Sequence, residues 1–570
     1  MPEELVELPG SHRRLPTGAR HVRDVAPGEQ LTVTVYVRRD PAAAPIVDLA
    51  AEGGRPPAER RYLTPAELAQ QFGADEEDLQ AVVSYAHAAG LTAGRQSPVT
   101  RSVQVSGPAP AVAAAFGVGN LAHYLQGDLT FRAQEGPVKL PGALAAVVEA
   151  VLGFDNRPLG RSYLRKPIER GWRGPIAQGA PPQLPPNNFY PPQVATLYDF
   201  PAPYDGTGET VAIFVFNGPV GSGASAPGGY DSSLLGRYFS QVLGIGAPHL
   251  TDVVVMGPGN DPGNGSTPAD VSGEVYLDLC IVGSLAPGAA IVVYFTEFTE
   301  QGWVDAISRA ATDTSSDPSV LSISYGNPES GGASAWTPMA VRQVNQAFEA
   351  AAAAGRTVCC AAGDSGAADE PSAGSVHVDF PASSPWVLGC GGTRLAAAGG
   401  RIRSEVVWND LDTGNGATGG GVSAVFPRPA WQAGVSAEAL PGVQVPAGGR
   451  GIPDVASLAD PQTPFVVLGP SGSLEQVGGT SAAAPVWAAL TCRLNQALGA
   501  RVGFLNPLLY SQVHPALRDI ISGNNGGYRA TAGWDACTGW GSPGASALLE
   551  ALANLPPSPS GSGSGTPGQP

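Results

Sequence analysis

The strongest constraint on the fold is a series of near-continuous apolar runs in the second two thirds of the chain. These runs are TVAIFVFN (210–217), AIVVYF (290–295), VLSISYG (320–326) and TVCCAAGDSG (357–366), with helical segments between them. Such runs are typical of strands buried on both faces, and their alternation with helices indicates a parallel sheet between two helical layers. Ligands bind such sheets at the carboxyl ends of the strands, so we expect functional residues there.

The first part of the chain has the pattern of a small α+β domain. LTVTVYVRR (31–39) and RSVQVSG (101–107) alternate in polarity like half-buried strands. Thr64-Pro65 predicts a helix start, because proline suits the first helical position. A further helix is expected with its cap near Asp75, and another over GALAAVVEAVLGF (142–154).

Composition places the domain boundaries. The stretch 166–188 is rich in Pro, Gly and Arg, which is typical of an exposed linker open to proteolysis. The last residues, 556–570, have no core-forming content and predict a flexible tail. The expected domains are therefore 1–165 and 189–555.

The net charge of −17 belongs entirely to the second part. Residues 1–185 carry 19 acidic and 19 basic side chains, whereas residues 186–570 carry 30 acidic and 13 basic ones. A strongly acidic second part argues against nucleic acid as a partner.

No apolar stretch approaches the ~18 residues of a membrane span, and the start, MPEELVELPGSHRR, lacks the apolar core of a secretory signal.

The six cysteines show no CxxC pair and no spacing suited to a metal. Most lie in apolar segments, so buried thiols are expected.

The sharpest motif is GGTSAAAP (478–485), followed by the apolar helical segment VWAALTCRLNQAL. Small residues around Ser481 at a helix start allow a substrate backbone to approach and leave N–H groups free to bind an oxyanion. GTS-x3-P is the nucleophile motif of subtilisin-like folds. The alternative is an ordinary serine or threonine helix cap.

A nucleophilic serine needs a base, and no histidine of the second part is suitably placed. His249, His377 and His514 all lie outside Gly-rich, helix-opening motifs. Glu274 and Asp278 are instead four residues apart in SGEVYLDLCIVGSLAPGA, on one helix face. Two close carboxylates tend to share a proton, so that one can act as a base. The alternative, a solvated acidic face, is less favoured beside the serine motif.

A carboxylate in place of histidine as the base predicts activity in acid. Imidazole, with a pKa of ~6.5, is protonated at pH ~4, whereas a glutamate near ~4.3 is well placed to accept a proton there.

The third element is GDSG (363–366), which closes an apolar strand. A chymotrypsin-like interpretation would make Ser365 the nucleophile, but it requires an all-β chain and an upstream catalytic histidine. A carboxylic acid at the end of a central strand can instead donate a hydrogen bond to an oxyanion while it stays protonated. We assign this role to Asp364.

With these residues in place, the chain resembles the sedolisins, the serine-carboxyl peptidases, and is most similar to the kumamolisin type. The matching segments of residues 190–550 are GEVYLDL, SVLSISYGNPES, AAGDSGAADE, VHVDFPASSPWVLGCGGTRL, VVWND, ATGGGVS, GGTSAAAP, LRDIISGNN and GWDACTGWGSP. The first part resembles the family's activation prodomain through YLTPAELAQQFGA, AAAFGV and VVEAVLGFDNRPLGR.

The resemblance implies a subtilisin-like α/β catalytic domain preceded by an inhibitory prodomain. The expected function is that of an acid-active endopeptidase, which is made as a self-processing zymogen and works through an acyl-enzyme. Expected partners are protein or peptide substrates and the chain's own prodomain, with no nucleic acid or membrane. The protein is expected to be an extracellular monomer.

The resemblance also assigns roles. Ser481 becomes the nucleophile, Glu274 the general base, Asp278 its partner and Asp364 an oxyanion donor beside the Ser481 amide. The chain from Ser324 to Gly326 is expected to pair with an extended substrate as an added strand. A further substrate-binding residue is expected at Asp379, in VHVDF, with a preference for a basic side chain.

A calcium ion is implied near the C-terminus. Asp519 and Asp535 would provide carboxylates, and Ile520, Thr531 and Gly533 backbone carbonyls. An all-oxygen set suits Ca²⁺.

Three positions depart from the family's pattern. Val215 and Tyr325 stand where kumamolisin-type enzymes extend the acid network with Glu and Trp, which leaves the pH optimum open. Thr531 stands where the family often has Gly.

The arginines of the prodomain are expected to dock against the acidic second domain near neutral pH. They are expected to be released when acid protonates the carboxylates of this interface.

Two other classes compete. A retaining glycosidase could use Glu274 and Asp278 as its carboxylate pair. It would have no need of the GTS-x3-P segment, and sugar-stacking aromatics are not clustered around the pair. A silent binding protein on the same fold would be expected to lose one of the four catalytic residues, and all four are present.

Overall fold

The protein is described by a computed structural model. It describes residues 4–168, 172–176, 182–220, 224–265, 267, 270–331, 336–368 and 376–558, with backbone alone at 219, 220, 224 and 225. Parts of the expected linker (169–171 and 177–181) and most of the expected tail (559–570) therefore lie outside the described residues.

A central, mostly parallel sheet confirms the fold class expected for the second domain. Its strands lie in the order β14-β15-β12-β16-β18-β20-β21, with β24 also parallel to β20 and with β21 antiparallel. The bounds are β14 Leu250–Val254, β15 Ala290–Glu297, β12 Thr210–Val220, β16 Val320–Ile323, β18 Thr357–Ala361, β20 Leu388–Ala398, β24 Val455–Leu458 and β21 Arg401–Val407.

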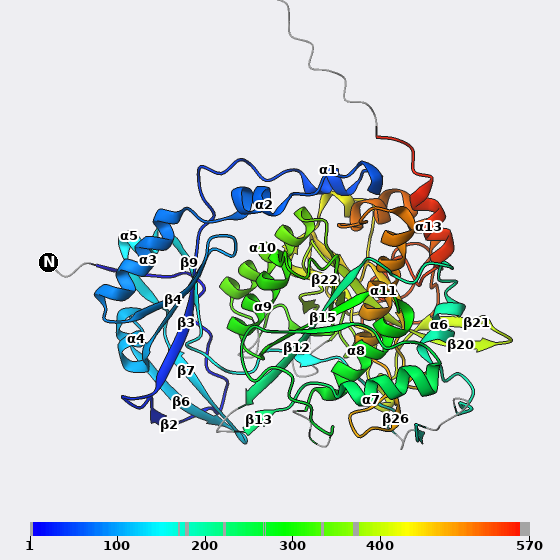
Figure 1. The fold of residues 1–570 in the computed structure, drawn as a ribbon, viewed down its shortest axis with the longest axis horizontal. Coiled ribbons are helices and arrows are strands. Elements are labelled where there is room, and N and C mark those ends of the chain that lie inside the picture. The colour runs from blue at the N-terminus through cyan, green and yellow to red at the C-terminus, as the bar shows by residue number, and fades with distance from the viewer. Residues whose placement is uncertain are drawn as a thin grey trace, which may run out of the picture.

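Helices cover both faces of this sheet (Figure 1). Alternate residues of β12 point to opposite faces, so Ile213 belongs to one buried cluster and Phe214 to the other. The first cluster contains α8 (Ser272–Leu285) and α11 (Thr480–Leu498). The second contains α9 (Glu300–Thr312) and α10 (Pro338–Ala353). The apolar runs are thus buried on both sides, as their sequence predicts.

Shorter elements complete this domain. They are α6 Pro191–Leu197, α7 Ser232–Arg237, β13 Ala224–Ala226, β17 Tyr325–Pro328, β19 Asp379–Phe380, β22 Gly421–Pro427, β23 Gly449–Ile452, β25 Phe465–Leu468, β26 Leu474–Val477, α12 Asn506–Leu508 and α13 Ala545–Ala553. None of the described helices is long and apolar enough to cross a membrane. All six cysteines are buried free thiols, as expected.

The N-terminal domain is built on a four-stranded antiparallel sheet in the order β4-β5-β3-β9. A second sheet has the order β2-β6-β7, and β1 pairs with β8. The bounds are β1 Leu5–Glu7, β2 Arg20–Asp24, β3 Gln30–Val37, α1 Leu49–Gly53, α2 Pro65–Phe72, α3 Glu76–Ala88, β4 Thr92–Ser97, β5 Ser102–Pro108, α4 Ala109–Ala115, β6 Asn120–Gln126, β7 Leu129–Glu135 and β8 Lys139–Pro141.

The helix starts predicted in this domain are confirmed. Thr64 and Glu67 form a capping box at the start of α2, and the Asp75 side chain caps α3. The helix predicted over 142–154 is wrong. Only one turn forms (α5, Gly142–Ala145), and Val148–Leu152 is strand β9. Its β-branched valines pair with β3 at the sheet edge, where they are better accommodated than in a helix.

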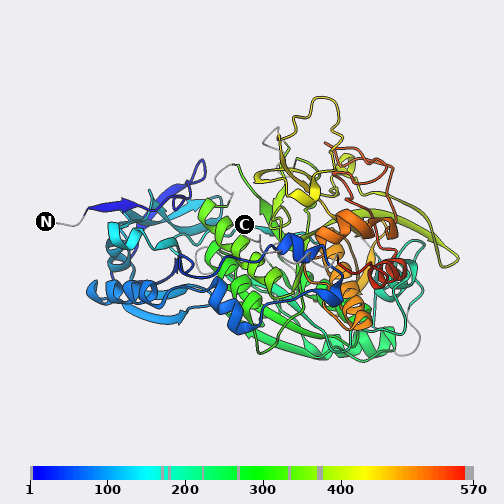
Figure 2. The ribbon, with the colours of Figure 1, turned by 90° about the horizontal axis from the view of Figure 1, so that it is seen from above.

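The N-terminal domain packs against α9 and α10 of the second domain (Figure 1). Thr34 donates to Asp305 Oδ2 of α9 at 3.2 Å, and the Tyr36 hydroxyl donates to the other oxygen. A segment that includes α1 and α2 extends from this domain across the second one (Figure 2). The Tyr62 hydroxyl there donates to the Arg501 carbonyl at 2.8 Å.

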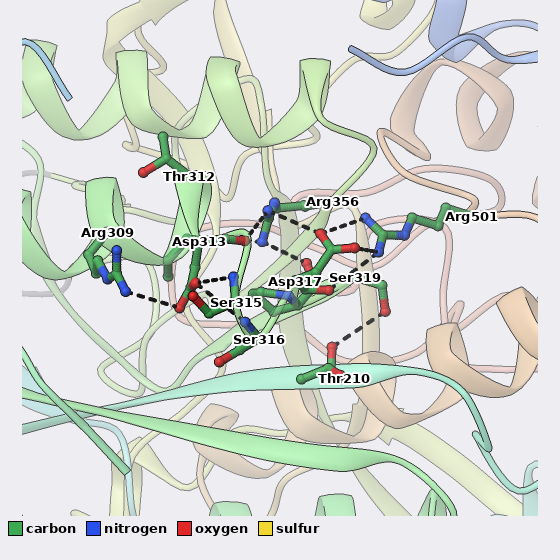
Figure 3. Close-up of polar contacts among 12 residues, drawn as sticks. Thr210, Arg309, Thr312, Asp313, Ser315, Ser316, Asp317, Ser319, Arg356 and Arg501 are labelled. Carbon is green, nitrogen blue, oxygen red and sulfur yellow. Dashed lines mark hydrogen bonds and ion pairs between the residues drawn. The ribbon is translucent and has the colours of Figure 1, made fainter. Parts of the chain in front are cut away.

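A polar cluster holds the connection between α9 and β16 at the amino edge of the sheet (Figure 3). The Arg356 guanidinium, with a side chain 4% exposed, donates to the Asp313 carbonyl at 2.7 Å. Arg501 donates to Asp317 Oδ2, also at 2.7 Å. Because these contacts satisfy loop groups at the end of the sheet away from the strands' carboxyl ends, we interpret the cluster as structural.

Candidate active site

Ser481 is the second residue of α11 and is fully buried, and Gly479, the residue before the helix, has a positive φ. Its Oγ donates to Glu274 Oε2 at 2.8 Å. A second contact, 3.1 Å, joins Oγ to the Ser324 carbonyl oxygen. The structure therefore brings together a serine of the GTS-x3-P motif and a glutamate 207 residues earlier in the chain.

Glu274 and Asp278 lie on one face of α8, and both are 1% exposed. Asp278 Oδ1 accepts a hydrogen bond from Ser324 Oγ at 2.7 Å. Ser324 thereby contacts both the second carboxylate and, through its carbonyl, the nucleophile. The two carboxylates of the predicted pair thus lie in the interior of the domain. This burial excludes the alternative of a solvated acidic helix face.

Burial dominates the electrostatics of this pair. It raises the pKa of Glu274 to about 8, against the opposing hydrogen bonds from Ser162 and Ser481. The pKa of Asp278 is raised well above its usual range by burial and then by the negative charge of Glu274. Two buried carboxyls whose pKa values are both raised hold at least one proton between them in acid.

Asp364 lies just beyond the carboxyl end of β18 and is fully buried. Its Oδ1 accepts hydrogen bonds from the Thr480 amide at 2.8 Å and from Thr480 Oγ1 at 2.7 Å. Burial raises the pKa of Asp364 to about 6, although the Arg165 guanidinium acts in the opposite direction. Oδ2 is therefore left to face the cleft as a neutral O–H in acid, which is the state that can donate to an oxyanion.

The cleft is filled by the chain's own residues 159–166. Arg161–Ser162 (β10) pairs antiparallel with β17, with Arg161 opposite Gly326. The Tyr163 amide donates to the Ser324 carbonyl oxygen at 3.2 Å. The segment thus extends the sheet edge at Ser324–Gly326 in the way expected of a bound substrate.

The same segment continues beyond the serine along a second strand. The Arg165 amide donates to the Gly478 carbonyl at 2.9 Å, and the Gly478 amide donates back at 2.8 Å. Backbone pairing on both sides of Ser481 fixes the register of residues 161–165 against the two strands that border the cleft. The Tyr163–Leu164 peptide bond lies between the two paired stretches.

Gly479 shows how closely this peptide bond approaches α11, the helix that carries Ser481. A Cβ at Gly479, whose φ is +95°, would lie 1.8 Å from the Tyr163 carbonyl oxygen and 2.7 Å from Asp364 Oδ2. Only glycine allows both the backbone conformation and the approach. The Tyr163 carbonyl therefore lies beside both Asp364 and the start of α11.

Two side chains of the segment contact predicted site residues. The Tyr163 hydroxyl donates to Asp379 Oδ2, and the Ser162 hydroxyl donates to Glu274 Oε2. Asp379, expected to favour a basic side chain, thus binds a phenol here, while the Arg161 guanidinium lies 3.9 Å from the same oxygen. Ser162 shares its acceptor oxygen with Ser481.

Cations at the junction of the N-terminal domain and the linker face carboxylates of the second domain. Arg165 Nε lies 3.1 Å from Asp364 Oδ2, and Lys166 Nζ lies 2.8 Å from Glu475 Oε2.

At the face between the two domains, by contrast, Asp305 accepts hydrogen bonds from neutral hydroxyls, and burial raises its pKa to about 6. A carboxyl whose pKa rises on docking favours docking in acid, so protonation of Asp305 would not release the N-terminal domain as the sequence suggested.

The residues predicted to bind calcium lie in two adjoining loops. The Gly533 amide donates to Asp519 Oδ2 at 2.8 Å, and the Thr531 amide donates to Asp535 Oδ2 at 3.2 Å. In the described part of the chain, no hydrogen bond reaches the carbonyl oxygens of Ile520, Thr531 or Gly533. Two carboxylates beside carbonyls with free lone pairs fit a hard cation.

Sequence reasoning missed several residues of the site. Thr480, which orients Asp364, belongs to the quoted motif and could have been found there. The segment 161–165 was assigned to the N-terminal domain, because nothing in its composition distinguishes a strand that docks in a cleft. Glu475 has no local signal either.

Two family models match the chain. Residues 17–157 match the pro-kumamolisin activation domain, and residues 254–541 match the subtilase family. Together they cover the two domains seen in the structure.

Whole-chain relatives agree with these models. The chain is 41% identical over 553 residues to kumamolisin from Bacillus sp. strain MN-32, covering 96% of each chain. It is 30% identical to sedolisin from Pseudomonas sp. strain 101, covering 85% of this chain and 80% of that one. A solved structure of Pseudomonas sedolisin, a serine-carboxyl proteinase bound to pseudo-iodotyrostatin, aligns with a TM-score of 0.54 at 28% identity, over 64% of this chain and 98% of the other.

Proposed function

The chain belongs to the sedolisin family of serine-carboxyl peptidases and carries the family's activation prodomain, and on this premise we propose an acid-active endopeptidase that processes itself. Ser481 is the nucleophile, Glu274 the base, Asp278 its partner and Asp364 an oxyanion donor. The observation that carries the proposal is the 2.8 Å hydrogen bond from Ser481 Oγ to Glu274 Oε2, beneath a strand laid across the cleft.

In the first step, Ser481 Oγ attacks the carbonyl carbon of the scissile peptide bond. Its proton passes to Glu274 Oε2 as the C–O bond forms, and negative charge develops on the former carbonyl oxygen. When the C–N bond breaks, Glu274 returns the proton to the departing amine. Water then attacks the acyl-enzyme by the same route and restores Ser481.

Asp364 stabilises the oxyanion only while it is protonated. Its carboxyl is held by Thr480 on one oxygen, so the other is available to donate beside the Ser481 amide. The pKa of about 6 implies that this donor is present below pH 6 and is lost as the pH rises through that value. This donor supports acid activity independently of the base.

Asp278 keeps the base in place and takes up the shared proton. Its pKa is raised by the charge of Glu274 as well as by burial, so one proton on Asp278 relieves the repulsion between the two. The family's additional acid is replaced by Val215, which is fully buried among apolar side chains. The acid network in this chain therefore ends at Asp278.

Self-processing is proposed to cut the Tyr163–Leu164 bond first. Tyr163 supplies the carbonyl beside Asp364 and Gly479, and its side chain reaches Asp379. Ser324 and Gly326 pair with the residues before the bond, and Gly478 pairs with Arg165 after it. The N-terminal domain then acts as an intramolecular inhibitor until this segment leaves the cleft.

One Ca²⁺ is proposed to bind Asp519, Asp535 and the carbonyls of Ile520, Thr531 and Gly533. When bound, it would supply charge neutralisation and a cross-link between two loops, with no part in the reaction. The substrates are proposed to be proteins and peptides, the enzyme a monomer and its place extracellular.

The test is self-processing of the full-length protein at pH 4 and pH 7, beside Ser481→Ala. We expect the wild type to shed its N-terminal domain in acid, with a new N-terminus at Leu164 detected by mass spectrometry, and then to digest a denatured protein. Ser481→Ala should stay whole. An intact wild type in acid with calcium present would overturn the proposal.

A further inference from the structure

Glu475 is a nearly buried carboxylate whose cationic partners come from the linker. It lies on β26, and its side chain is 6% exposed. Lys166 Nζ lies 2.8 Å from Oε2, and an Arg173 guanidinium nitrogen lies 3.6 Å from Oε1. Both ion-pair partners seen in the described part of the chain belong to residues 164–185, which a cut at Tyr163–Leu164 frees at one end and leaves attached to the second domain at the other.

The position of Glu475 relative to Ser481 follows from the strand register. Gly478 pairs with Arg165 in both directions, and β26 runs antiparallel to the linker, with Arg173 opposite Glu475. Lys166 directly follows Arg165, so it is the third residue after the Tyr163–Leu164 bond. Glu475 therefore lies along the path that any substrate takes beyond the scissile bond.

The protein holds this carboxylate in place from its own side. Ser471 Oγ donates to Glu475 Oε1 at 3.3 Å. A Cβ at Gly469 would lie 2.4 Å from Glu475 Cδ, so the absence of a side chain there makes room for the carboxylate. A side chain so confined cannot turn to bulk solvent when the linker leaves, and a nearly buried carboxylate without a cation is unfavourable.

We propose that Glu475 is a specificity-determining residue of the processed enzyme, which selects Lys or Arg as the third substrate residue after the cleaved bond. A substrate that enters the cleft in the register of this segment displaces Lys166, and its own third residue after the cleaved bond then faces Glu475. The proposal rests on the proposed peptidase function and on the register of the linker as a model substrate. It concerns the leaving-group side of the cleft, remote from Asp379.

The experiment uses enzyme obtained by acid processing of the full-length chain. Its substrates are three fluorogenic peptides based on Arg-Ser-Tyr-Leu-Arg-Lys-Pro-Ile, with Lys, Ala or Glu at the sixth position. The wild type should show a kcat/KM about three- to tenfold higher for Lys than for Ala, with Glu lowest. Glu475→Gln should abolish this order, and Glu475→Lys should favour the Glu peptide.

Glu550→Gln, an exposed carboxylate on α13, is the matched control and should keep the preference for Lys. Equal rates for the three peptides with the wild type would overturn the role of Glu475 and leave the peptidase function intact. If the wild type cleaves none of these peptides and does not digest a denatured protein substrate, that result would contradict the peptidase function itself. Because the wild-type comparison alone decides the preference, a variant that folds poorly does not prevent the test.

Discussion

Arg165 of the segment that crosses the cleft and Asp364 form an ion pair in which Nε and Oδ2 are 3.1 Å apart. The guanidinium favours the charged form of Asp364, which cannot donate a hydrogen bond to an oxyanion. Before processing, this segment thus fills the cleft and also limits the protonated form of Asp364, the proposed oxyanion donor, to a lower pH range. The first two predictions follow from this pair.

Removing Arg165 should widen the pH range of self-processing. Without the guanidinium, the pKa of Asp364 rises, so its donor O–H persists to higher pH. Arg165→Gln should therefore process itself at pH 6–7 about threefold or more faster than the wild type. Gel densitometry against time at several pH values measures this. Arg403→Gln, on an exposed strand, is the control, and equal rates for both variants would contradict the prediction.

Asp364→Asn should flatten the upper limb of the pH–activity profile. An amide keeps the acceptor for Thr480 and a donor toward the cleft, and it does not titrate. Because a weaker donor replaces an optimised one, kcat should fall about 10²-fold in acid. The residual self-processing should persist above pH 6, where self-processing of the wild type falls. A pH profile of the self-processing rate measures this: a decline near pH 6 in Asp364→Asn like that of the wild type would exclude titration of Asp364 as the cause of the decline.

Ser162→Ala should speed the first cut. The Ser162 hydroxyl donates to the same Glu274 oxygen as Ser481 Oγ, and it lowers the pKa of the base. Without it, Glu274 Oε2 accepts from Ser481 Oγ alone, which favours transfer of the Ser481 proton, so we expect about threefold faster processing. Ser162→Thr keeps the hydroxyl and should behave like the wild type. A slower Ser162→Ala would show that the hydroxyl helps to position the linker instead.

Asp305 should make docking of the N-terminal domain stronger in acid. Burial at the domain face raises its pKa to about 6. The stabilisation is therefore fully present below the ordinary pKa of an aspartate and is lost as the pH rises through 6. In the Ser481→Ala background, Asp305→Asn should raise Tm at pH 7 by about 1–2 °C and change it little at pH 4. A larger gain at pH 4 than at pH 7 would contradict this sign.

Calcium removal should destabilise the processed enzyme. Binding to the folded state alone adds about 2.7 kcal/mol at a hundredfold excess over Kd, so a chelator should lower Tm by several degrees. Asp535→Asn, whose amide oxygen can still accept from the Cys537 amide but not also from the Thr531 amide, should abolish the response to added Ca²⁺. Differential scanning fluorimetry with and without Ca²⁺ measures this change in Tm. A full response in Asp535→Asn would place the ion elsewhere.

The sequence predicted the second domain well because its signals are local and repeated. Runs buried on both faces fix the strands, and GTS-x3-P marks a serine in the first turn of a helix. The spacing of Glu274 and Asp278 places both on one face of α8. The prediction of a helix at 142–154 failed because helical and strand patterns are similar in a short Val- and Ala-rich run, and pairing with β3 decides between them.

By itself, the sequence determined which residue types could perform the chemistry and in which elements they lie. Only the tertiary structure decided that residues 161–166 cross the cleft, that Arg165 faces Asp364 and that Lys166 faces Glu475. Such pairs join residues 199 and 309 positions apart. No periodicity spans that distance, because contacts of this kind depend on how two domains pack and not on the local preferences of either segment.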